Sequence, residues 1–88
     1  MINNVYREAE TCEVLKEGFL KELVEYNSYG SLGTLNWVVD ILQIIRKRIL
    51  FGEKIKLEKS EEILTVESFY QLIEDNFVGY VFKNLETK

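Results

Sequence analysis

Residues 35–51 read LNWVVDILQIIRKRILF, and this segment decides the fold. A helix over this segment is apolar around most of its circumference, with only a thin polar stripe. The stripe consists of Asn36, Asp40, Gln43 and Lys47. Such a helix has to be covered on several sides by its own chain or by a partner. We therefore expect a central helix over residues 34–51, capped by Thr34 and terminated by Gly52.

Residues 5–26 carry a second helical pattern. Apolar side chains recur every three or four residues, which places them on one stripe of a helix. They are Val5, Ala9, Cys12, Leu15, Phe19, Leu23 and Tyr26. Glutamates occupy much of the opposite face. We expect one uninterrupted helix over residues 4–27, followed by a turn at residues 27–33, where Gly30 and Gly33 are typical turn residues.

The segment after the central helix is ambiguous. Residues 54–58 alternate between polar and apolar side chains, which is typical of a half-buried strand, and residues 62–64 could return beside them. The intervening residues 59–61 lack the Asn-Gly or Asp-Gly of a tight hairpin, so a short helical turn begun by Ser60 is the alternative. Thr65 is placed to cap a third helix over residues 66–86.

These patterns predict a mainly α protein whose 88 residues form a single domain. It contains three helices, with a central apolar second helix and a possible small β-hairpin between helices two and three.

The composition argues against an enzyme, because the chain contains no histidine and one cysteine. General acid–base catalysis uses histidine most often, and structural zinc sites need histidine or several cysteines. We interpret Asp40 as part of an exposed helix edge and Cys12 as a core residue, so neither is expected to be catalytic. We expect no catalytic residues, no cofactor and no metal site.

The cysteine content and the N-terminus indicate the compartment. One cysteine permits no internal disulfide, and residues 1–4 lack the features of a signal peptide. No stretch approaches the ~18–20 uninterrupted apolar residues of a membrane span. We expect a cytoplasmic protein with no membrane contact.

The net charge of −4 conceals a basic middle segment between two acidic ones. Its basic residues are Arg46, Lys47, Arg48, Lys54, Lys56 and Lys59. We favour the interpretation that the acidic flanks neutralise this segment within the fold. The alternative is contact with nucleic acid or an acidic partner, as in a small DNA-binding transcriptional regulator that uses residues 46–59. The negative net charge argues against that alternative.

Val78, Phe82 and Leu85 form a stripe that is rotated away from the apolar face of residues 66–77, at 100° per residue of helix. A straight helix packed on one core cannot bury both stripes, so either the helix bends near Gly79 or this stripe meets another chain. We expect it to bind a partner protein or a second copy. The expected function is a non-enzymatic protein-binding factor, namely a small inhibitor, an adaptor, an immunity-type protein or a homo-oligomer. The abundance of Ile, Asn, Lys, Glu, Tyr and Phe is typical of AT-rich microbial or phage genomes, which carry many small acidic inhibitors, so a phage or mobile-element origin is expected.

Overall fold

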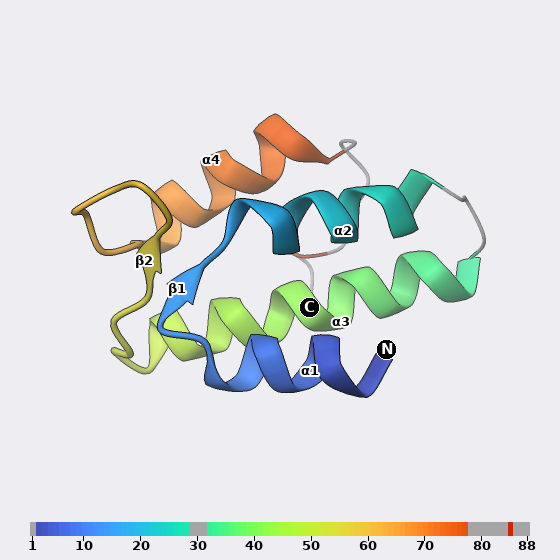
Figure 1. Ribbon diagram of the computed structural model, residues 1–88, viewed down its shortest axis with the longest axis horizontal. Helices are drawn as coiled ribbons and strands as arrows, with labels where there is room; N and C mark the ends of the chain where they lie inside the picture. The colour runs from blue at the N-terminus through green and yellow to red at the C-terminus, as the bar shows by residue number, and fades with distance from the viewer. Residues whose placement is uncertain (1, 29–31, 78–84, 86–88) are drawn as a thin grey trace.

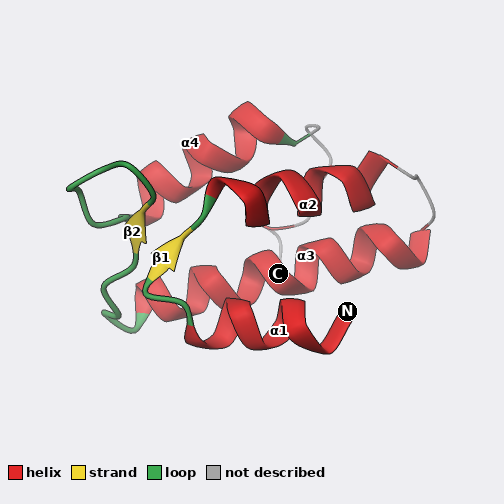
Figure 2. Cartoon of the chain, in the orientation of Figure 1, coloured by secondary structure: helices red, strands yellow, loops and turns green. Residues whose placement is uncertain are grey.

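The computed structural model describes the backbone of residues 2–28, 32–77 and 85, and the side chains within residues 4–26, 37–77 and 85. This part of the chain is mainly helical, as the periodicity predicted, and contains four helices and two short strands (Figures 1 and 2). Their order is α1 (Ile2–Thr11), β1 (Val14–Leu15), α2 (Glu17–Ser28), α3 (Leu32–Leu50), β2 (Lys56–Leu57) and α4 (Val66–Asn76).

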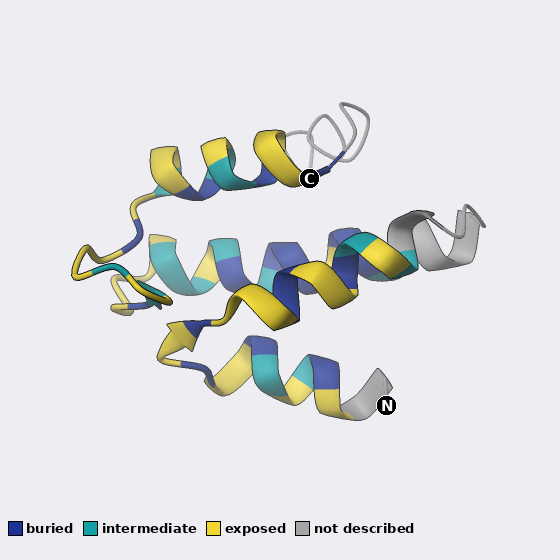
Figure 3. Ribbon diagram, turned by 45° about the horizontal axis from the view of Figure 1, so that its top comes forward, coloured by how far each residue is buried: buried dark blue, intermediate teal, exposed yellow. Residues whose placement is uncertain are grey.

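Helix α3 is the central element, which confirms the main prediction from its sequence. It contacts α1, α2 and α4, and in Figure 3 the buried residues of α1 and α4 lie on the sides that face it. Ile41, Leu42 and Ile45 on α3 are completely buried. The helix begins at Leu32, so the prediction that Thr34 caps it is wrong.

The predicted single helix over residues 4–27 is wrong, because the chain leaves the helical path between α1 and α2. There β1 pairs in parallel with β2, in the register Val14↔Lys56 and Leu15↔Leu57. The Lys56 N–H donates to the Glu13 carbonyl at 2.9 Å, and the Glu58 N–H donates to the Leu15 carbonyl at 3.0 Å. The carbonyls of Glu13 and Leu15, which would have accepted helical hydrogen bonds, therefore accept bonds from residues 56 and 58 instead.

The predicted hairpin at residues 53–64 is present only as a single antiparallel bridge between Lys56 and Ile63. The bond from the Leu64 N–H to the Ile55 carbonyl, at 2.8 Å, belongs to this bridge. Lys59 makes the turn with a φ of 67°, and no helix begins at Ser60 within residues 53–64. β2 therefore lies between β1 and the returning residues.

Helix α4 begins where its sequence predicted, because Thr65 caps it. The Thr65 hydroxyl accepts from the Ser68 N–H at 3.1 Å, and the Ser68 hydroxyl accepts from the Thr65 N–H at 2.8 Å. The predicted extent to residue 86 is wrong. The helix ends at Asn76, since Phe77 adopts an extended backbone with φ −123° and ψ 161°.

Candidate functional site

Of the stripe expected to bind a partner, Val78, Phe82 and Leu85, the structure describes only Leu85. Leu85 is completely buried, and its carbonyl accepts a hydrogen bond from the Gln43 amide at 2.9 Å. Leu85 therefore belongs to the core and offers no free contact surface. Val78 and Phe82 lie outside the described residues, so their role stays a prediction. Gln43, expected on an exposed edge, is only 7% exposed because it faces Leu85.

Arg48 joins three parts of the fold. Its Nη1 donates to the Ala9 carbonyl at 2.9 Å and to the Cys12 sulfur at 3.5 Å. Its Nε and Nη2 donate to one carboxylate oxygen of Glu53, at 3.1 and 3.0 Å. This guanidinium therefore fastens the end of α1 to the end of α3 and is not free for an external ligand.

Arg46 is also held within the fold. Its Nε donates to the Tyr70 hydroxyl at 2.6 Å, and its guanidinium lies 5.9 Å from the centre of the Tyr70 ring. Its Nη1 donates to the Gln43 amide oxygen at 3.4 Å. The two arginines of the basic segment therefore connect helices.

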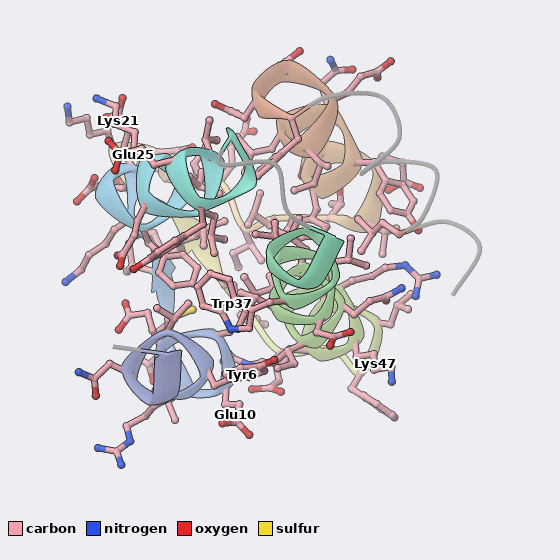
Figure 4. All side chains as sticks on the ribbon, turned by 90° about the vertical axis from the view of Figure 1, so that its right-hand side faces the viewer. Tyr6, Glu10, Lys21, Glu25, Trp37 and Lys47 are labelled. Atoms are coloured by element: carbon pink, nitrogen blue, oxygen red, sulfur yellow. The ribbon has the colours of Figure 1, made fainter. Side chains whose placement is uncertain are left out.

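The lysines of the basic segment are partly neutralised, as we favoured. Lys56 lies 3.7 Å from the Glu61 carboxylate, and Lys59 lies 3.7 Å from that of Glu17. Lys47 and Lys54 are exposed and make no ion pair with a described residue. Figure 4 shows Lys47 projecting away from the other helices. Two cations are a small surface for nucleic acid, since binding through phosphates normally uses many more.

The two side chains weighed as catalytic, Cys12 and Asp40, differ in burial. Cys12 is buried, as predicted, and burial raises the pKa of its thiol although the hydrogen bond from Arg48 opposes the rise. The thiolate is therefore disfavoured. Asp40 is exposed, as expected. Within the described ranges, no cluster of His, Cys, Asp or Glu side chains is suited to a metal ion, and no helix has the length and apolarity needed to cross a bilayer.

Among the described side chains, the most exposed large apolar ones lie where α3 ends. Phe51 is 85% exposed and Leu50 is 55% exposed. Lys47 lies one helical turn before Phe51, and Lys54 follows Phe51 by three residues; both are exposed and neither makes an ion pair with a described residue. We call the set of Lys47, Leu50, Phe51 and Lys54 the Phe51 tip.

The backbone of the Phe51 tip is fixed by the turn that ends α3. The Phe51 N–H donates to the Lys47 carbonyl at 2.9 Å, the Gly52 N–H to that of Ile49 at 3.0 Å, and the Glu53 N–H to that of Arg48 at 3.0 Å. Gly52 has a φ of 91°, a conformation that glycine adopts without strain. The turn therefore presents Phe51 to solvent from a rigid base. The sequence indicated the turn through Gly52, but it did not indicate that Phe51 is exposed to solvent.

A pocket of about 260 Å³ lies between the loop after β2 and α4, and we call it the β2–α4 pocket. Its apolar residues are Leu57, Ile63, Leu64 and Leu72, and its charged residues are Glu62 and Asp75. Ile63 is 46% exposed, so the apolar lining reaches the surface.

Comparison of the chain with protein-family models, with curated proteins and with solved structures gives no match. The functional argument therefore rests on the geometry of the chain itself.

Proposed function

We propose that this chain is a non-enzymatic protein-binding factor of the inhibitor, adaptor or immunity type, and that it binds through the Phe51 tip. The observation that supports the proposal is the 85% exposure of Phe51 on a hydrogen-bonded turn. Single exposed apolar side chains are common, but here Leu50 is exposed beside Phe51. In this proposal the protein acts in the cytoplasm.

The Phe51 tip has the chemistry of an interface anchor. Aromatic side chains that enter a pocket carry much of the binding energy of protein interfaces. The turn at Gly52 holds the backbone of Phe51 in place before binding, so little backbone entropy is lost when the partner docks. Lys47 and Lys54 add positive charge at the tip. They favour a partner whose apolar pocket has acidic residues at its rim.

Site-directed photocrosslinking tests this proposal. A photoreactive phenylalanine analogue replaces Phe51 in cells of the native host, and a matched chain carries it at Glu67, an exposed residue of α4. We expect position 51 to capture a defined protein that position 67 does not capture. That protein, once purified, should bind Phe51→Ser at least about 30-fold more weakly than the unchanged chain, because a central aromatic anchor contributes about 2 kcal/mol or more.

Val14→Ser is the control for that binding measurement, because Val14 is also exposed, at 38%, but lies on β1. We expect this variant to bind like the unchanged chain. Equal capture from positions 51 and 67, or unchanged affinity of Phe51→Ser, would contradict the proposal.

A further inference from the structure

The β2–α4 pocket matches an aromatic side chain in size and chemistry. An apolar cavity of about 150 Å³ is enough to bind benzene, and this pocket measures about 260 Å³. Four aliphatic side chains, those of Leu57, Ile63, Leu64 and Leu72, line it. A phenyl ring placed there would contact apolar groups.

The rim of the pocket is acidic. Glu62 and Asp75 line it, and no described basic side chain does. The Asp75 carboxylate accepts a hydrogen bond from the neutral Gln71 amide at 2.9 Å, which leaves its charge uncompensated by that partner. The pocket thus pairs an apolar lining with two negative charges.

The Phe51 tip carries the complementary set. It presents one exposed phenyl ring from Phe51, together with Lys47 and Lys54, which make no ion pair with a described residue. We propose that the β2–α4 pocket of one copy of this chain receives the Phe51 tip of a second copy. This inference rests on the proposed function, because it names the partner of the same tip.

The arrangement of the two surfaces suits reciprocal pairing. The turn that follows α3 and the loop that precedes α4 lie at the same end of the molecule (Figure 1). Two copies related by a two-fold axis can therefore bring both tips to both pockets. A closed dimer of this kind uses the same patch on each subunit.

Sedimentation velocity over a range of concentrations tests the pairing. We expect the unchanged chain to form a dimer, and we expect Phe51→Ser and Ile63→Ser each to raise the dissociation constant about 30-fold, as loss of an interface anchor does. Val14→Ser should dimerise normally, and circular dichroism should show that all of these variants are folded. A chain that stays monomeric at high concentration, or a dimer that survives Phe51→Ser, overturns the inference.

A charge exchange identifies the contact. One variant carries Lys47→Glu with Lys54→Glu, and the other carries Glu62→Lys with Asp75→Lys. Each variant alone places like charges at both contacts and should be monomeric, whereas their mixture restores opposite charges at both and should form a heterodimer. A mixture that remains monomeric overturns the inference.

The crosslinking experiment separates this inference from the proposed function. Capture of a different protein from position 51, by a chain that is monomeric, overturns self-association and leaves the proposed function standing. Capture of a second copy from position 51 supports both.

Discussion

Replacement of Arg48 by methionine should destabilise the fold strongly. The Arg48 side chain is only 11% exposed. Methionine keeps an apolar stem of similar length and removes the guanidinium. The change deletes the bonds to the Ala9 carbonyl and to the Glu53 carboxylate. The junction between α1 and α3 then has no group to replace them.

The magnitude follows from these two contacts. A hydrogen bond from a charged group to a partly buried acceptor such as the Ala9 carbonyl contributes about 1.5–3 kcal/mol. The pair with Glu53 contributes only about 0.2–1 kcal/mol, because the Glu53 side chain is 52% exposed and water screens it. We expect Arg48→Met to lower the free energy of unfolding by about 2–4 kcal/mol, which is a large part of the stability of a small domain.

Urea unfolding measures this loss, with fluorescence of the single tryptophan, Trp37, as the signal. Lys47→Met is the matched control, because Lys47 is exposed on the same helical turn, and it should cost less than about 0.5 kcal/mol. Glu53→Gln should cost about 0.2–1 kcal/mol, and in Arg48→Met the same change should have no further effect. If Arg48→Met is no more destabilising than Lys47→Met, the role assigned to Arg48 is refuted.

Three further predictions concern buried residues. Leu42→Ala and Ile45→Ala should each cost about 2–5 kcal/mol in urea unfolding, because both side chains are completely buried, and a cost below about half a kcal/mol would place them outside the core. Gln43→Leu should cost about 1–3 kcal/mol, since it leaves the Leu85 carbonyl without its donor, and an unchanged midpoint would show that this bond is unimportant. Burial raises the pKa of the Cys12 thiol above its ordinary value of 9.0. The stability that this shift contributes is therefore fully present below pH 9.0 and is lost as the pH rises through the raised pKa. Cys12→Ala should therefore flatten the alkaline decline in stability, and a thiol reagent should label native Cys12 far more slowly than the unfolded chain.

The candidate site was only partly predictable. The position of Arg48 at the end of a helix was evident, but its acceptor on Ala9 lies 39 residues away in sequence. Phe51 continued the apolar pattern of residues 35–51, and nothing local distinguished it from the core residues before it. Its exposure of 85% depends on which segments pack around the end of α3, which is a property of the tertiary structure.

The sequence by itself determined the mainly helical class, the central helix and the start of α4. Apolar periodicity and the Thr65 cap act between residues a few positions apart, so local hydrogen bonding and the need to bury one face were enough to predict them. Only the tertiary structure decided the break between α1 and α2, where the apolar spacing of Cys12, Leu15 and Phe19 continues without interruption. The physical reason is that Val14 and Leu15 gain backbone partners on β2, about 42 residues later, and the free energy of that pairing depends on both segments together.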